Sequence, residues 1–376
     1  MSANATEPES IAAKHRASAR IGTVALVAGL IASACASSDG DPMLEGAGAS
    51  TQTPITTAWM EGFRTETGAE LEYVAVGSTT GRELFLAGEV DFAGSDVYLT
   101  DEERRMAQTT CAGSLGAVHV PTYLSSIGLV YNLPSLEGEQ LNLSADVIAG
   151  IYTGDITNWN DPAIASDNPG VDLPDLLIVP VHRYDSSGTT DNFTEYLTVA
   201  APSVWSYGEF SNWSDNGPAG KSAVYSNGTA QVVASAEGSI GYVDVAQASG
   251  LPLAAIEAGD GFVAPTDESV TEAFALASTT YSPDTQDLMV EFDRVPDSSS
   301  AYPLAMLSYT VVCLQYEDLA TANLVGSYLY FVQSDEAQQI ASTTAGAVQL
   351  NAETTERIQA ISESIGAFDS ADGPIA

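Results

Sequence analysis

The sequence predicts an α/β fold. Strand-like and helix-like segments alternate along the chain from about residue 43, which is typical of α/β architectures. Three predicted strands between residues 44 and 96 also end in Gly, Ser, Thr or Asp. Such junctions gather at the carboxyl edge of an open sheet, where ligands bind. The chain has 376 residues and is 45% apolar, which is enough for a sizeable core in one large or two medium domains.

The first predicted strand and helix lie near the start of this region. Residues 44–51 (LEGAGAST) indicate a strand that ends in a glycine turn. A helix is expected next, because Pro54 suits a first turn and Trp59 and Phe63 are spaced for a buried stripe. Gly68 is a suitable stop for that helix.

The next segments repeat this order. Residues 69–76 predict a strand, 77–81 (GSTTG) a turn, 82–87 a short helix and 90–96 a short strand with a polar end. Further strands are expected at 125–133, 175–183, 239–246 and 302–316, a turn at 151–161, and helices at 318–335 and 351–366.

Residues 1–35 predict an export signal outside the fold. A basic region containing Lys14, Arg16 and Arg20 precedes the apolar stretch 21–34, which is too short for a comfortable membrane span. The small residues before Cys35 resemble a bacterial lipoprotein cleavage site. This resemblance implies a lipid on Cys35 and a soluble body tethered outside the cell. The alternative is an ordinary signal peptide with an incidental cysteine.

The charge of the chain limits its partners. It contains 11 Lys and Arg against 50 Asp and Glu, for a net charge of −39. A surface this acidic disfavours nucleic acid and anionic lipid. A local anion site inside a cleft is still possible, because solvent and salt screen distant charges.

Two cysteines remain after the leader, Cys111 and Cys313. Export permits a disulfide between them. The alternative is two separate buried thiols.

The stretch 183–189 (RYDSSGT) has the composition of an oxyanion site. A helix is predicted over 190–197, so Ser187, Gly188 and Thr189 stand at its N-terminus, where backbone N–H groups are free. The guanidinium of Arg183 matches two oxygens of a phosphate-like group, and Asp185 can orient it. Alone, the same residues would also suit a helix cap with a surface salt bridge.

Six stretches together resemble the phosphate-binding component of bacterial high-affinity phosphate ABC importers. They occur in the order of that family and cover nearly all of the mature chain. The stretches are Gly46 to Ser50, Gly77-Ser78, Asp91 to Asp96, Ile151 to Trp159, Arg183 to Thr189 and Ser239 to Val243.

The resemblance implies a two-lobed periplasmic-binding-protein-like fold, each lobe a mixed sheet flanked by helices, with the ligand cleft between them. Lobe one is expected at 43–121 plus 301–376 and lobe two at 122–300. Both cysteines would then lie in lobe one and could join its two segments. The phosphate-binding positions implied are Ser50, Thr51, Ser78, Asp96, Arg183, Ser187, Gly188 and Thr189, with Asp185 in support. Thr51 departs from the family, in which an aromatic residue is common there.

The family also implies partners and location. The ligand would be inorganic phosphate, and the protein partner an ABC permease. The protein would be an extracytoplasmic monomer that contacts the membrane only through its lipid anchor, with no cofactor, no metal and no chemistry on its ligand.

Asp96 is informative because a carboxylate repels an anion. It fits a ligand that carries a proton to donate, as phosphate does and sulfate near neutral pH does not. A site built this way rejects a ligand that lacks the proton. The interpretation therefore favours phosphate over sulfate.

Three other functions remain. An enzyme could use Ser50 or Ser187 as a nucleophile, but neither has a G-x-S-x-G context, and strand alternation would point His182 away from the face of Arg183. No residues have metal-ligand spacing. An adhesion or sensor protein would keep the same fold. A transport receptor for sulfate, molybdate or an organic phosphonate would keep the same role.

Overall fold

The computed structural model describes residues 42–113, 115–136, 138–282 and 287–365. The predicted leader, including Cys35, lies outside the described residues. In these four ranges, no helix has the length and apolar character that a membrane span requires.

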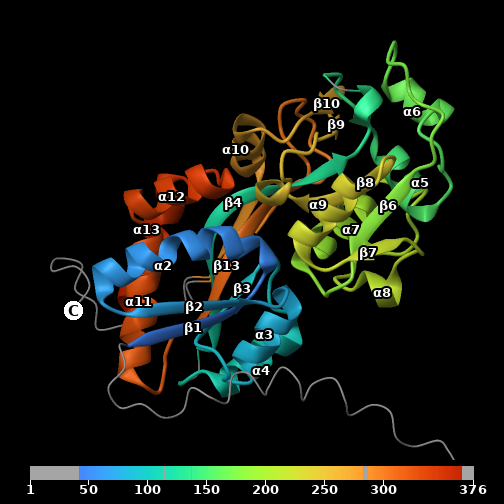
Figure 1. Ribbon diagram of the computed structural model, residues 1–376. Coiled ribbons are helices and arrows are strands. Elements are labelled where there is room, and N and C mark those ends of the chain that lie inside the picture. Colours follow the sequence, from blue (N-terminus) through green and yellow to red (C-terminus); the bar gives the residue numbers. More distant parts are fainter. Residues whose placement is uncertain (1–41, 114, 137, 283–286, 366–376) are drawn as a thin grey trace, which may run out of the picture. The chain divides into compact units, whose positions relative to one another are not determined.

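The main sheet is mixed, and its strands lie in the order β2-β1-β3-β13-β4-β8-β6-β7 (Figure 1). The strands are β1 (Met43–Gly48), β2 (Glu70–Ala75), β3 (Phe92–Ser95), β4 (Ala117–Tyr131), β6 (Val179–Arg183), β7 (Lys221–Ala223), β8 (Ser239–Asp244) and β13 (Ala305–Cys313). Two smaller sheets contain β5 (Asn142–Leu143) with β9 (Ala255–Ala258) and β10 (Gly261–Val263), and β11 (Ser278–Tyr281) with β12 (Leu288–Glu291).

Helices connect most of these strands. They are α2 (Thr53–Thr67), α3 (Ser78–Leu86), α4 (Asp101–Thr110), α5 (Ala145–Thr153), α6 (Pro162–Asp167), α7 (Gly188–Ala200), α8 (Trp213–Asn216), α9 (Tyr225–Ser235), α10 (Asp267–Leu276), α11 (Leu319–Val332), α12 (Asp335–Ala345) and α13 (Ala352–Ile365), with short 3-10 turns η2 (Ser50–Gln52), η3 (Pro134–Leu136) and η4 (Val245–Gln247). The expected α/β class is therefore confirmed.

The first helix forms as its sequence predicts. Pro54 lies in the first turn of α2, and Gly68 ends the helix in the left-handed conformation. Trp59 and Phe63 are fully buried. The indole of Trp59 donates to the carbonyl oxygen of Ala337 at 2.8 Å, so α2 packs against α12 although the two are far apart in sequence (Figure 1).

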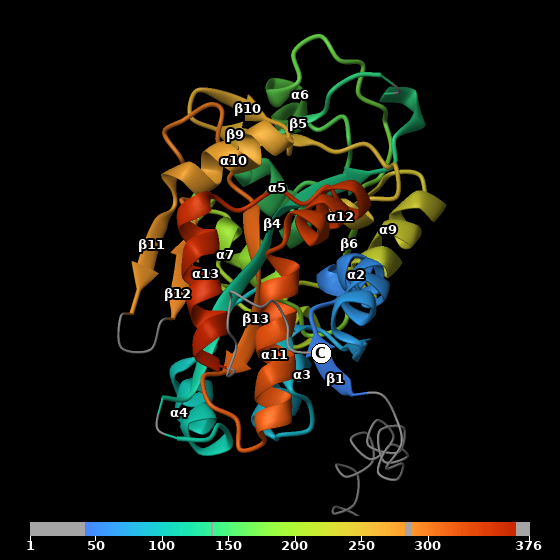
Figure 2. The same cartoon turned by 90° about the vertical axis from the view of Figure 1, so that its left-hand side faces the viewer.

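Strand β4 joins two halves of the main sheet. Its residues 117–126 pair with β13, and its residues 127–131 pair with β8. We call β2, β1, β3, β13 and residues 117–126 the first half of the sheet, and residues 127–131 with β8, β6 and β7 the second half. In Figure 2, β4 runs the length of the sheet beside β13, and the C-terminal helices α11 and α13 pack nearby.

The predicted pair of cysteines forms a disulfide. Cys111 follows α4 and Cys313 ends β13, and the bond closes a sequence separation of 202 residues. Both cysteines lie in a small apolar cluster with Phe85, Leu99 and Val311. The bond therefore links the segment after β3 to β13, which is the last of the described strands in the sequence.

Several predicted boundaries were wrong, and three of them bear on the site or the sheet. Residues 78–81 are not a turn, because Gly77, at φ 87°, already serves as the N-cap and α3 begins at Ser78. The predicted turn at 151–161 includes the end of α5, which stops only at the left-handed Gly154. Strand β4 begins at Ala117 instead of residue 125.

Candidate functional site

The predicted site residues from the first half of the sheet lie at its carboxyl edge. Strands β1, β2 and β3 are parallel neighbours, so the residues that follow them meet at one edge. Ser50 follows β1, Ser78 follows β2 and Asp96 follows β3.

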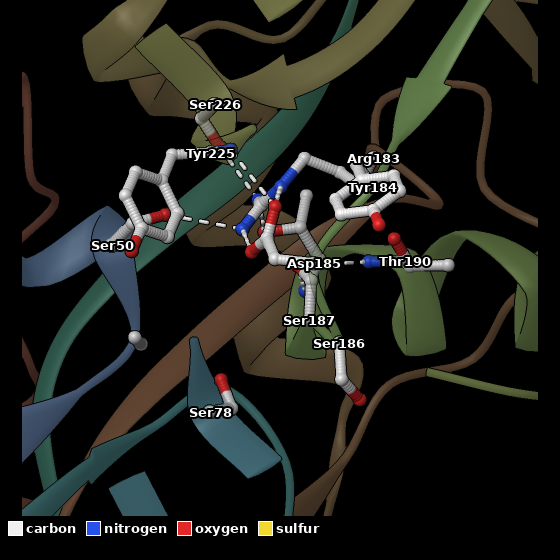
Figure 3. Close-up of polar contacts among 12 residues, drawn as sticks. Ser50, Ser78, Arg183, Tyr184, Asp185, Ser186, Ser187, Thr190, Tyr225 and Ser226 are labelled. Atoms are coloured by element: carbon white, nitrogen blue, oxygen red, sulfur yellow. Dashed lines mark hydrogen bonds and ion pairs between the residues drawn. The ribbon is translucent and has the colours of Figure 1, made fainter. Parts of the chain in front are cut away.

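The second half of the sheet supplies Arg183 and the loop behind it. Arg183 is the last residue of β6, which runs parallel to β7 and β8. Residues 184–187 then lead into α7. Hydrogen bonds link this loop to Ser50 and Ser78, so the structure brings the predicted residues of both halves together (Figure 3).

The site is almost completely shielded from solvent. The predicted side chains are each at most 4% exposed: Ser50, Thr51, Ser78, Asp96, Arg183, Ser187 and Thr189. Gly188 is buried as well. Burial strengthens the electrostatic interactions of every charged group at the site.

Every N–H donor of the Arg183 guanidinium has a partner within the chain. Its Nε and Nη2 donate to the two carboxylate oxygens of Asp185. Its Nη1 donates to the hydroxyls of Thr189 at 3.4 Å and Ser226 at 3.1 Å, and Nη2 also donates to the hydroxyl of Ser50 at 3.2 Å. The guanidinium is thus fixed by one carboxylate and surrounded by three neutral hydroxyls.

Asp96 accepts hydrogen bonds from two hydroxyls. Thr51 Oγ1 lies 2.9 and 3.0 Å from its two carboxylate oxygens, and Ser308 Oγ donates to Oδ1 at 2.7 Å. Because Gln52 Nε2 donates to Ser308 Oγ at 2.9 Å, the Ser308 proton is free to point at Asp96. Burial raises the pKa of Asp96, while these hydroxyls and the charge of Arg183 act in the opposite direction.

Gly188 permits the close approach of the two halves. Its backbone N–H donates to Ser78 Oγ at 3.3 Å, and the N–H of Asp96 donates to the same oxygen at 3.3 Å. A Cβ added at Gly188 would lie 2.8 Å from both Asp96 Cβ and Ser78 Oγ. Any side chain at this position would push the halves apart.

The N-termini of helices α3 and α7 lie at this cluster. Ser78 begins α3 behind a glycine cap. Ser187 caps α7 by accepting from the N–H groups of Thr189 and Thr190 at 3.1 and 3.4 Å. Helix N-termini carry partial positive charge and favour anions.

Further contacts between the two halves surround the site. Ser186 Oγ donates to Thr79 Oγ1 at 2.9 Å, and Gln247 Nε2 donates to the carbonyl oxygen of Ser50 at 2.8 Å. The amide of Asn192 on α7 donates to the carbonyl oxygen of Asp96 at 2.9 Å.

Four residues of the site were missed from sequence: Asn192, Ser226, Gln247 and Ser308. Ser308 left little signal, because it is one of three consecutive hydroxyl-bearing residues, with Tyr309 and Thr310, in a strand that is otherwise apolar (AMLSYTVVC). Ser226 lies near the start of α9. The first residues of α9 are polar, like those of α7, and this similarity was the signal in the sequence. Asn192 and Gln247 gave no signal, since their partners lie far away in sequence.

A cavity of about 340 Å³ borders the site residues Asp96 and Asn192. Its lining includes Asp191, Glu195, Glu209 and Arg294. Burial, and then the charge of Glu209, raise the pKa of Asp191 to about 7. This acidic lining does not suit an anion, whereas the cluster around Arg183 contains a cation and several hydroxyl groups.

The histidines have structural surroundings. His182 stacks on Trp213, with 5.1 Å between ring centroids, and burial lowers its pKa. His119 is fully buried, accepts from the N–H of Leu99 at 2.9 Å and contacts Asp287 at 2.8 Å. No group of three or more metal-ligating side chains occurs among the described residues.

Comparisons with known proteins show the family of the chain. Residues 18–336 match the family model of the PBP superfamily domain. The chain is 35% identical over 305 residues to phosphate-binding protein PstS 3 of Mycobacterium tuberculosis, covering 79% of this chain and 80% of that protein. It is also 35% identical over 268 residues to PstS 2 of the same organism, covering 70% and 71% of the two chains.

A solved structure has the same fold. The phosphate-binding protein from Stenotrophomonas maltophilia superimposes with a TM-score of 0.67 at 20% identity, covering 85% of this chain and 94% of that chain. The expected two-lobed periplasmic-binding-protein-like fold is confirmed. With this fold and with these relatives over most of its length, the chain belongs to the PBP superfamily and, within it, to the family of the PstS phosphate-binding proteins.

Proposed function

We propose that this protein captures inorganic phosphate outside the cytoplasm and delivers it to an ABC permease, without chemistry on the ligand. The observation that carries the proposal is the buried meeting of Arg183, Asp96 and the two helix N-termini at the carboxyl edges of both sheet halves. The names of its relatives agree with this choice of ligand.

Phosphate binding replaces two of the hydrogen-bond acceptors of the Arg183 guanidinium. The hydroxyls of Ser50 and Thr189 are the most distant acceptors of its guanidinium, at 3.2 and 3.4 Å. Phosphate oxygens replace these two acceptors, because a charged acceptor forms a stronger hydrogen bond with a guanidinium than a hydroxyl does. Asp185 keeps its bidentate contact and fixes the plane of the guanidinium throughout.

The remaining predicted residues complete the shell around the ligand. The hydroxyls of Ser50, Ser78, Ser187 and Thr189 and the N–H groups at Thr51 and Gly188 donate to phosphate oxygens. Asp96 acts in the opposite sense, because its carboxylate accepts a hydrogen bond from the protonated oxygen of phosphate. An ion with no proton cannot donate to Asp96 and places a second negative charge against this buried carboxylate, which is the basis of selection against sulfate.

We place lobe one at 43–121 plus 301–376 and lobe two at 122–300. This division separates the phosphate contacts into Ser50 to Asp96 on one lobe and Arg183 to Thr189 on the other. The ligand favours the closed arrangement, in which both sets reach it, and so shifts the population of open and closed forms. The permease recognises the closed form.

The location follows from the leader sequence. Cys35 carries the lipid anchor, and the body is a monomer tethered outside the membrane. Arg183, Asp96 and the hydroxyls bind the ligand and none attacks it, so no catalytic residue is assigned.

Titration calorimetry tests the proposal directly. The soluble body from Ala36 onward, freed of bound phosphate, is titrated with phosphate and then with sulfate at neutral pH and moderate salt. We expect one tight phosphate site and no sulfate heat. Absence of phosphate binding would refute the function and leave the fold unaffected.

A further inference from the structure

Tyr225 has a backbone conformation that is unusual for its residue type. Its φ is 63°, one of two positive values at non-glycine residues among the described residues, the other being Ser249 at 55°. Large side chains disfavour this left-handed region, whereas glycine and asparagine accept it readily. Strained residues of this kind cluster at functional sites.

Contacts on both sides of Tyr225 account for the conformation. Its N–H donates to Asp185 Oδ1 at 2.8 Å, and the hydroxyl of the next residue, Ser226, accepts from Arg183 Nη1 at 3.1 Å. The Asp185–Arg183 pair therefore fixes the backbone at the start of α9. Glycine would make the same backbone contacts without strain, so the fold does not need a tyrosine here.

The side chain of Tyr225 extends from α9 toward Ser50. Figure 3 shows this direction, and α9 is in contact with η2, the turn that begins at Ser50. The phenol is partly buried and close enough to Asp185 and Arg183 for their charges to act on its pKa. Among the described residues its hydroxyl has no hydrogen-bond partner, so the ring contributes size at this place more than it contributes to the polar network.

We propose that Tyr225 determines ligand specificity by covering the side of the site where Arg183 meets Ser50. The inference rests on the proposed function, because Ser50 and Thr189 are the acceptors that the ligand replaces on Arg183. A bare oxyanion fits beneath the ring with all its oxygens in contact with donors. An oxyanion with an organic substituent on that side, such as a phosphate monoester, would overlap the ring and is excluded.

The test compares methyl phosphate with phosphate by competition calorimetry. In Tyr225→Gly, the affinity for methyl phosphate relative to phosphate should rise by about tenfold or more, the usual worth of removing a steric barrier of this size. Phosphate should also dissociate faster, because its cover is gone. Tyr225→Phe keeps the ring and should retain the wild-type ratio.

Two further variants control for folding and for strain. Tyr225→Asn removes the ring in a residue that accepts the left-handed conformation, and it should reproduce the change seen with glycine. Ser249→Gly relieves the other left-handed residue and should leave the ligand ratio unchanged. An unchanged ratio in both Tyr225→Gly and Tyr225→Asn would overturn the inference.

The same experiment separates this inference from the proposed function. If the wild type binds sulfate instead of phosphate, the proposed function fails and the role of the ring is judged on methyl sulfate against sulfate. If the wild type binds no bare oxyanion, both proposals are overturned.

Discussion

The amide of Asn192 joins the two halves of the sheet beside the proposed anion site. Its Nδ2 donates to the carbonyl oxygen of Asp96 and to that of Gly188, both at 2.9 Å. Arg294 fixes the amide from behind, because its Nη2 donates to Asn192 Oδ1 at 2.5 Å. Arg294 is itself paired with Glu195 at 2.9 Å. A buried arginine outside the predicted site therefore orients a contact that brings Asp96 to Gly188.

Replacing Asn192 by alanine should weaken phosphate binding by about tenfold, since the buried carbonyls and Arg294 lose a partner and the closed arrangement is no longer favoured. Titration calorimetry measures the change. Asn216→Ala is the matched control, because the Asn216 amide makes an exposed contact with the carbonyl of Asn212. Equal affinities in the two variants would show that Asn192 has no role in closure.

Asp96→Asn should reduce discrimination between phosphate and sulfate by about tenfold or more. The amide is nearly the same size, and it can donate to an ion that has no proton. The ratio of the two dissociation constants is the measurement. An unchanged ratio would contradict the role given to Asp96, even if affinity for both ions fell.

Arg183→Ala should lower affinity for every oxyanion by at least about a hundredfold, because it removes the fixed guanidinium and leaves the negative charge of the partly buried Asp185 without its cation. Arg183→Lys should recover only part of this loss, since an ammonium lacks the planar fork. Arg105→Ala on the exposed face of α4 is the control. Wild-type affinity in Arg183→Ala would place the anion elsewhere.

Asp244 should make the folded protein less stable as pH rises from about 4 to about 7. Burial raises its pKa to about 7, although the hydroxyl of Ser125 donates to it at 2.8 Å. An unfolded aspartate titrates near 3.9, so between about pH 4 and pH 7 the folded chain binds more protons than the unfolded chain. The contribution of Asp244 to the free energy of unfolding then falls across this window, by up to about 4 kcal/mol, and levels off above it.

Urea unfolding at several pH values tests this. Asp244→Asn should flatten the profile between pH 4.5 and 7, whereas Asp215→Asn, an exposed aspartate, should follow the wild type. Parallel profiles for all three proteins would mean that Asp244 ionises normally in the folded state.

Loss of the Cys111–Cys313 disulfide should lower the free energy of unfolding by about 2–5 kcal/mol, as expected for a bond that closes a long loop. Urea unfolding with and without a thiol reductant measures the difference. The double variant Cys111→Ser with Cys313→Ser should match the reduced wild type and show no response to reductant. If the free energy of unfolding of the wild type stays the same although its cysteines are shown to be reduced, the prediction is refuted.

Local sequence was sufficient to predict the candidate site residues that directly follow a strand. Ser50, Ser78 and Asp96 each follow a short strand within a few residues. Parallel strands place such residues at one edge whatever their order in the sheet, so their meeting could be predicted without knowing the topology. The position of the loop from Arg183 to Thr189 could be predicted for the same reason, because it follows the strand β6.

The sequence was insufficient to predict where a strand changes its pairing partner or which side chain contacts a residue across the sheet. The first part of β4 contains Pro121, and prolines are rare within sheets. In the structure Pro121 faces Tyr309 at the bulge where the register of β13 shifts. Ser308 lies beside that bulge and reaches Asp96 from 212 residues away, a contact that only the three-dimensional pairing defines.

The pairing of β4 has a consequence for the order of folding. The strands of the second half of the sheet all lie between residues 127 and 244, so they can pair as soon as that segment has been made. In the first half, β3 and β4 are both joined to β13, which begins only at Ala305. Closing so long a segment is slow. The half of the sheet that begins first in the chain is therefore completed last.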